Sequence, residues 1–541
     1  MAVFSIKSFG GIAPVVPRRY LQDNQAQTAM NCPVFQGSIQ AIADLGASVA
    51  DLPKTGTIKS LYRFGQDTIS DTNYWFHWTT DVDVARSQIA GDASEWTFFT
   101  GDGSPKATYN SIAISGSNYP AATRPLGLAA PTTAPTATAD TFTGEDGVLE
   151  TRVYAVTWVN KESGFEFESA PSSASNSVDV RPGQTATLTN LPAAPGGDYV
   201  VSHRRIYRAV AGVFLFVAEI AASATSYTDN VEPDSLGEEL PSLTWSAPPT
   251  SLEGLTNLPN GLMAGFSGRD IYFCDPYHPH AWPEQYIQTI DYPVVGLGRM
   301  DTTLAVLTKG TPYFIQGTHP LNMSVVKADI EQACVSKNSI VSLMGGVLYA
   351  APDGLMLISP GGSRIVTEKL FDFSQWQAFF NPSSIHAYQH DNQYIAFYNN
   401  GSQSGGFIFD VRSGQFILHD MYADAGYHDI LRDKLFLAVA DSGNKVKPWG
   451  YGNTKSYIWR SKKFSLPQVM GFSCAQLEAE AYPMTLKFYL DNTLYHTQTV
   501  QNRNPFRLPA KVGRDLEMQV EGSNEVFSLS IANSMTELAS G

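Results

Sequence analysis

One short stretch gathers the residue types that bind metals or catalyse hydrolysis. Residues 271–286, IYFCDPYHPHAWPEQY, contain two histidines, a cysteine and two acidic residues. Imidazole nitrogen, thiolate sulfur and carboxylate oxygen are the ligands that zinc takes in proteins. The candidate zinc ligands in this stretch are His278, His280, Cys274 and Asp275.

A purely structural interpretation of the same stretch competes with the metal site. Pro279 separates the two histidines and would break a strand ladder, and no second His or Cys cluster lies nearby in the sequence. The residues IYFCD then form a strand that ends at Asp275, and a proline-stiffened connection follows. Tyr277 and Trp282 are expected to pack against the edge of that sheet, and we expect no metal here.

Acidic residues elsewhere could form the carboxylate pair of a glycosidase. They mostly lie in predicted turns, where Asp accepts hydrogen bonds from backbone N–H groups. The sequence has no Gly-x-Ser-x-Gly motif and no glycine-rich phosphate loop with its lysine. We therefore predict no catalytic residue, no cofactor and no metal, and we predict that the protein is not an enzyme. The turn acids considered are Asp353, Asp391, Asp410 and Asp420.

The tightest basic cluster lies in the segment GGDYVVSHRRIYR. Strand alternation places Arg204, Ile206 and Arg208 on one face. Arg205 and Tyr207 then lie on the opposite face. We predict that these arginines form a solvated face of a β-module.

The overall charge argues against a protein that holds nucleic acid tightly. The 541 residues carry 51 acidic and 36 basic side chains, which gives a net charge of -15. Proteins that bind DNA without sequence preference present excess Lys and Arg to the phosphates. The protein either has no nucleic-acid partner or meets nucleic acid without holding it.

The cysteine content and the hydropathy of the chain indicate the cellular compartment in which the protein is made. Four widely spaced cysteines do not make a disulfide framework, so we expect buried thiols. The N-terminus lacks a signal-peptide pattern, and no apolar run is long enough to span a membrane. We expect synthesis in a cytoplasm. The cysteines are Cys32, Cys274, Cys334 and Cys474.

Strand periodicity dominates the chain. Short apolar runs recur roughly every 8–12 residues between turn signals such as 267–270 and 352–354, which predicts an all-β protein. Between 246 and 466, units of about 35–50 residues each open with two apolar strands around a tight turn, which is typical of propeller blades. An array of sandwiches is the alternative. The units begin at LPNGLMAGF, VVGLGRMDTTLAVLT, SIVSLMGGVLYAA, SIHAYQHDNQYIAF and GYHDILRDKLFLAV.

Composition divides the chain into four parts. Residues 1–125 hold an N-terminal segment and the first blades. Residues 126–245 hold a Pro/Thr/Ala linker and an inserted β-sandwich of the fibronectin type III kind. Residues 246–467 supply the remaining blades, and 468–541 form a C-terminal β block, either a last blade or a small sandwich. Two helices are expected, one capped by Asp23 and the other within 370–380.

Several stretches resemble a family of phage and prophage virion proteins. The opening FGGIAPVVPRRYLQDNQAQTAMNCPVFQGSIQAI combines a glycine-rich start, an arginine and a Leu–x–Asp–Asn–x–Ala–Gln motif. The resemblance continues through residues 82–109, 271–286, 304–341, 347–359 and 506–538. These proteins are similar in organisation to the tail nozzle proteins of short-tailed phages.

The resemblance implies a structural virion protein of the phage tail, made in the cytoplasm of the host bacterium. It implies a β-propeller that assembles as a homo-oligomeric ring, most often a hexamer, below the tail adaptor protein. Tail fibre or spike proteins are further expected partners, and double-stranded DNA is expected to pass during ejection without tight binding. It also implies that 271–286 is a structural signature. The alternatives are a receptor-binding or polysaccharide-degrading tail component, and a carbohydrate-active propeller enzyme unrelated to phage.

Overall fold

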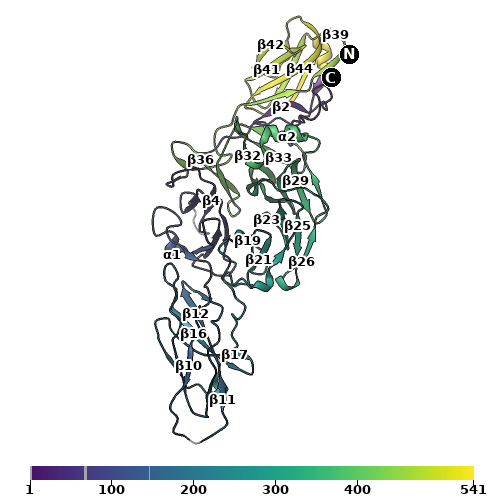
Figure 1. Ribbon diagram of the computed structural model, residues 1–541. Helices are drawn as coiled ribbons and strands as arrows, with labels where there is room; N and C mark the ends of the chain where they lie inside the picture. The colour runs from purple at the N-terminus through teal and green to yellow at the C-terminus, as the bar shows by residue number, and fades with distance from the viewer. Residues whose placement is uncertain (1–2, 66–69, 145, 541) are drawn as a thin grey trace. The chain divides into compact units, whose positions relative to one another are not determined.

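The computed structural model describes residues 3–65, 70–144 and 146–540, and most of its regular structure is β-strand (Figure 1). The chain divides into two compact units. The first comprises Met1–Trp75, Ala305–Tyr313 and Lys327–Gly541. The second comprises Phe76–Leu304 and Phe314–Val326.

The first unit contains antiparallel four-stranded meanders. One meander consists of β27 (Val341–Leu343), β28 (Gly346–Ala351), β29 (Gly354–Ser359) and β30 (Gly362–Ile365). The next consists of β31 (His386–His390), β32 (Gln393–Asn399), β33 (Ser404–Asp410) and β34 (Phe416–His419). Their central strands are continuous apolar runs between turns, because both faces of these strands are buried.

A third meander of this unit is closed by a strand from the other end of the chain. It consists of β35 (Ala425–Asp429), β36 (Lys434–Ala440) and β37 (Asn444–Pro448). The N-terminal strand β3 (Ala50–Leu52) pairs with β37 and completes the four strands. Four-stranded meanders are the blades of β-propellers. The chain thus has the predicted fold class.

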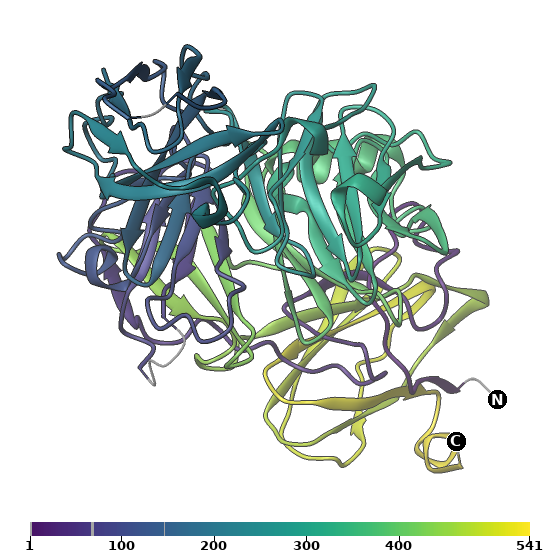
Figure 2. The ribbon, with the colours of Figure 1, turned by 90° about the horizontal axis from the view of Figure 1, so that it is seen from below.

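The C-terminal block is a sandwich that includes the start of the chain. One sheet has the order β1 (Val3–Ile6), β45 (Val526–Ala532), β40 (Cys474–Ala479) and β43 (Phe506–Arg507). The other contains β2 (Ala26–Met30), β38 (Tyr457–Ser461), β44 (Val512–Gly522), β41 (Met484–Leu490) and β42 (Thr493–Val500), with β39 (Phe464–Gly471) also paired to β44. Figures 1 and 2 both show β1 beside the yellow C-terminal strands. The second sheet is continuous with the β31–β34 meander, because β2 also pairs in parallel with β34.

The second unit contains two further four-stranded meanders. The first consists of β6 (Asp83–Arg86), β7 (Thr97–Thr100), β8 (Lys106–Thr108) and β9 (Arg124–Pro125). The second consists of β19 (Glu253–Asn257), β20 (Met263–Ser267), β21 (Asp270–Phe273) and β22 (Gln288–Thr289). The hairpin turn between β20 and β21 is the one predicted at 267–270.

A β-sandwich is inserted between these two meanders. One sheet has the order β10 (Thr136–Ala139), β15 (Ala186–Thr189) and β18 (Tyr227–Asp229). The other has the order β13 (Phe165–Glu168), β12 (Tyr154–Glu162), β16 (His203–Val210) and β17 (Val213–Ala221). β11 (Glu150–Arg152) pairs with β14 (Val178–Val180). Three strands facing four is the arrangement of fibronectin type III-like sandwiches. The first strand of the module, β10, lies within residues 126–145, the Pro/Thr/Ala stretch that was expected to be a linker.

The remaining elements complete the description. The other strands are β4 (Ser60–Arg63), β5 (Trp75–Trp78), β23 (Val294–Met300), β24 (Thr303–Thr308), β25 (Tyr313–Gln316) and β26 (Ser324–Lys327). The helices are α1 (Asn110–Ala113), α2 (Phe373–Phe380) and α3 (Met535–Ser540). Short 3-10 turns are Pro233–Ser235, Glu284–Tyr286, Pro320–Asn322, Lys337–Ser339 and Pro382–Ser384.

One helix prediction is confirmed and the other is wrong. Helix α2 lies within 370–380, and the side chain of Asp372 caps it by accepting a hydrogen bond from the backbone N–H of Gln375. Asp23 caps no helix, because the residues after it form strand β2. Pairing of β2 with β38 satisfies the backbone groups that a helix would have satisfied internally, and Asp23 instead accepts a hydrogen bond from Lys462.

Candidate functional site

The stretch 271–286 is a tightly bonded turn. Strand β21 ends at Phe273, and Asp275 then joins two parts of the turn. One carboxylate oxygen of Asp275 lies 2.9 Å from Nδ1 of His278, and the other accepts a hydrogen bond from the hydroxyl of Tyr286. The indole N–H of Trp282 donates to the carbonyl of Pro279. These contacts use the polar groups to hold the turn itself.

His280 is a core residue. Its side chain is 3% exposed, and Nε2 accepts a hydrogen bond from the backbone N–H of Glu168 at 3.3 Å. Its ring packs against Phe167 and Trp245. Burial, with a smaller contribution from His278, lowers the pKa of His280 to about 3, so the ring is neutral at neutral pH.

The structural interpretation of the stretch fits these contacts. Within the described ranges, the group of at least three His, Cys, Asp or Glu residues whose ligand atoms converge lies elsewhere and includes neither His278 nor His280. The expected packing is confirmed for Trp282, which is 2% exposed. Tyr277 is 53% exposed, and its ring lies against Gly261 in the turn before β20.

We expect His280 to make the protein less stable in acid. The unfolded state takes up a proton near the ordinary histidine pKa of about 6.5, whereas the folded state resists it down to about 3. The free energy of unfolding therefore falls as pH falls through this window. Between about pH 7.5 and about pH 5, H280Q should lose about 2 kcal/mol less stability than the wild type. Denaturant unfolding at both pH values measures this difference.

The half-exposed His278 provides the matched control for that experiment. H278Q leaves His280 buried, so this variant should keep the contribution that His280 makes to the pH dependence. Equal pH dependence in H280Q and the wild type would contradict the buried, neutral state of His280.

The basic cluster on β16 does not form a solvated face, and that prediction is wrong. Arg204 is 2% exposed and Arg208 is 0% exposed. The guanidinium of Arg204 lies 5.0 Å from the centre of the Trp158 ring and donates to the carbonyl of Ala222. Alternation itself is confirmed, since Arg205 and Tyr207 both reach Glu168 on the opposite face.

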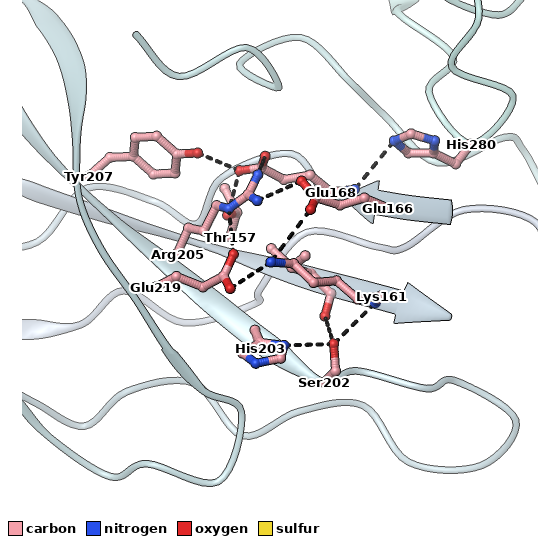
Figure 3. A network of polar contacts seen from close by, with 11 residues as sticks. Thr157, Lys161, Glu166, Glu168, Ser202, His203, Arg205, Tyr207, Glu219 and His280 are labelled. Atoms are coloured by element: carbon pink, nitrogen blue, oxygen red, sulfur yellow. Dashed lines mark hydrogen bonds and ion pairs between the residues drawn. The ribbon is translucent and has the colours of Figure 1, made fainter. Parts of the chain in front are cut away.

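Arg205 is neutralised by three carboxylates of the inserted sandwich (Figure 3). Its guanidinium donates to Glu168 at 2.8 Å and to Glu219 at 3.0 Å, and it pairs with Glu166. Burial lowers the pKa of Arg205, but the charges and hydrogen bonds of Glu168 and Glu166 outweigh it and raise the pKa above its usual value. Lys161 pairs with Glu219 at 2.7 Å beside it. This cluster leaves no open cationic surface at Arg205.

Arg208 belongs to a buried ion cluster at the other face of β16. It donates to Asp229 at 2.8 Å, and both side chains are 0% exposed. The hydroxyl of Tyr154 also donates to Asp229, at 2.7 Å, and Arg152 lies 3.6 Å away. The arrangement satisfies a carboxylate deep inside the sandwich and offers nothing to solvent.

The remaining sequence candidates have structural roles. All four cysteines are buried free thiols, as predicted. The turn acids Asp353 and Asp391 lie in hairpin turns, and Asp410 accepts hydrogen bonds from the backbone N–H groups of Arg412 and Ser413. Asp420 pairs with Lys455 at 3.0 Å.

A cluster that the sequence did not reveal lies between two meanders of the first unit. His390 ends β31, His428 lies on β35, and Asp433 lies in the turn before β36. One ligand atom from each lies within 4.8 Å of the others. The only sequence signal is a His-Asp pair in each of two successive repeat units, His390-Asp391 and His428-Asp429.

The comparisons with known proteins give weak structural likenesses. The structure of BBS1N in complex with ARL6DN matches with a TM-score of 0.28 and 10% identity over 68% of this chain and 91% of that chain. Apo AztD from Citrobacter koseri matches with a TM-score of 0.28 and 11% identity over 67% and 98%. Hsv2 of Kluyvelomyces marxianus matches with a TM-score of 0.26 and 10% identity over 58% and 94%. Likenesses this low carry no argument about function.

Sequence comparison and hydropathy add two findings. No family model and no curated protein matches the chain. No helix within the described ranges is long and apolar enough to cross a membrane.

Proposed function

We propose that the protein is a structural virion protein that forms the tail nozzle of a short-tailed phage. In this proposal, identical subunits form a closed ring, a hexamer, below the tail adaptor protein, and tail fibres or spikes attach beside it. DNA passes through the ring during ejection. The proposal rests on the resemblance of the opening and closing segments and is supported by the propeller fold.

The charge arrangement is the structural observation that carries the conduit function. The chain has a net charge of -15, and its tightest arginine cluster is buried or neutralised by carboxylates of the same sandwich. Phosphate contacts from Lys and Arg would hold DNA and slow its passage. Because the clustered arginines are paired within the protein, they are not available to bind phosphates. The net negative charge then repels the duplex, which favours passage with little friction.

We expect the assembled ring to bind duplex DNA weakly. Tight non-specific binding requires several phosphates to be neutralised at once, and it weakens steeply between about 50 and about 200 mM salt. Electron microscopy of the protein mixed with its adaptor tests the ring, and duplex binding at both salt concentrations tests the conduit.

Two outcomes would contradict the proposal. A protein that stays monomeric with its adaptor and is absent from virions does not form a nozzle. Nanomolar DNA binding that collapses with salt would indicate a basic lumen. Cleavage of host polysaccharide by the purified protein would instead favour the polysaccharide-degrading alternative.

A further inference from the structure

Strands β31 and β35 lie side by side, and each contributes a histidine to the contact between them. Tyr388 and His390 are two residues apart and therefore lie on the same face of β31. Gly426 and His428 lie on one face of β35 for the same reason. A Cβ atom on Gly426 would lie 2.8 Å from the Tyr388 ring, so the two strands are in close contact there. Two residues further along each strand, the rings of His390 and His428 lie 5.8 Å apart.

The two imidazoles have buried nitrogen atoms without partners. Nδ1 of His390 and Nε2 of His428 are both inaccessible to solvent and make no hydrogen bond. A buried polar atom without a partner costs about 1–3 kcal/mol, so this pair is unfavourable as it stands. The nearest acid, Asp433, lies 3.7 Å from Nε2 of His428, which is too long for a hydrogen bond.

Asp391 and Asp433 lie close to the two imidazole rings. Burial, followed by the neighbouring His390, lowers the pKa of His428. Nε2 of His390 lies 3.6 Å from a carboxylate oxygen of Asp391. This separation is too long for a hydrogen bond, so the carboxylate adds a negative charge beside the ring without fixing the orientation of the ring.

The turn that carries Asp433 is held by other contacts. Asp429 forms a buried ion pair with Arg63 at 3.0 Å, and Asp71 pairs with Arg432 and with Lys434. Asp433 therefore does not hold the turn, and its side chain is 78% exposed. It can move toward the two histidines without disturbing the turn.

We propose that His390, His428 and Asp433 bind a divalent transition metal ion, with zinc as the first candidate. Two imidazole nitrogens and one carboxylate oxygen are a donor set that zinc accepts, whereas calcium and magnesium prefer oxygen ligands alone. The ion would satisfy the orphaned nitrogens and join the β31–β32 hairpin to the β35–β36 hairpin. Water completes the coordination. The site acts as a staple between neighbouring blades and is independent of the nozzle proposal.

The test uses full-length protein without an affinity tag, freed of metal by chelation. We expect one Zn²⁺ or Co²⁺ ion per chain by calorimetry, a Co²⁺ absorption spectrum typical of nitrogen and oxygen ligands, and a rise in Tm on adding Zn²⁺. H390A and H428A should each weaken Zn²⁺ binding by more than about 100-fold, since losing an outer partner alone costs about 10–100-fold. D433N should weaken it less, because the histidines remain.

Two control variants separate this site from general effects. H278Q removes a half-exposed histidine paired with an acid, and D441N removes an exposed acid from the next hairpin of the same meander. Both should bind Zn²⁺ as the wild type does. If H390A or H428A fails to fold, Zn²⁺ binding by D433N and the Co²⁺ spectrum of the wild type still test the proposal. No stoichiometric binding to the wild type, or unchanged binding in D433N and the histidine variants, overturns the proposal.

Discussion

Replacing Asp229 with alanine is expected to lower the free energy of unfolding of the inserted sandwich by about 3–5 kcal/mol. Asp229 is completely buried, and it pairs with the completely buried Arg208. Removing the carboxylate leaves that guanidinium charged in the core, with Arg152 also losing its nearby counter-charge. The hydroxyl of Tyr154 loses its acceptor at the same time. Urea unfolding of the full chain, followed by the fluorescence of Trp158 and its neighbours, measures the change.

Two companion variants isolate the cause. D229N keeps the shape of the side chain and removes only its charge, so it should recover part of the packing but little of the ion pairing. D234A removes an exposed acid of the same sandwich and should stay within about 0.5 kcal/mol of the wild type. If D229A is no less stable than D234A, the buried ion cluster is not a stabilising element.

Replacing Gly11 with alanine is expected to destabilise the first unit by about 3 kcal/mol or more. A Cβ at this position would lie 2.3 Å from the carbonyl oxygen of Phe416, an approach that requires the backbone to move. That same oxygen accepts a hydrogen bond from the backbone N–H of Ile12, and Gln415 accepts one from Gly11 itself. The added methyl group therefore disturbs packing and two hydrogen bonds together. Thermal unfolding checks the prediction.

The glycine Gly196 is the matched control for G11A. A Cβ added at Gly196 would have no atom within 4 Å, and the residue lies outside the left-handed region, so G196A should change Tm little. A Tm for G11A close to that of G196A would show that the opening segment is looser than its contacts indicate. The same close approach explains why the opening motif needs a glycine at position 11.

Local patterns predicted the blades well because each blade is built from neighbouring hairpins. The unit starting at SIHAYQHDNQYIAF forms β31 and β32, and the unit starting at GYHDILRDKLFLAV forms β35 and β36. The turn between β28 and β29 lies at Pro352 and Asp353, as predicted. Strand periodicity and turn chemistry are contained within such short windows, so no distant residue is needed to interpret them.

Local sequence patterns do not show which side chains from other strands pack against a given strand. Alternation placed Arg204 and Arg208 on one face, but burial of that face depends on Trp158 and Asp229 from other strands. The His390 and His428 cluster arises only because β31 lies beside β35, which the sequence does not state. The environment of these side chains is set by residues that are distant in the sequence and close in the fold.

Because early strands pair with late ones, parts of the chain must fold in a fixed order during synthesis. β1 has its partner in β45, and β3 has its partner in β37, so both wait for most of the chain to be made. At ~5–20 residues per second, the ribosome takes about 25–105 s to travel from β1 to β45. Meanwhile the opening segment has unpaired backbone edges that invite wrong partners. The inserted sandwich has its strands within one continuous segment and can form well before the ends of the chain meet.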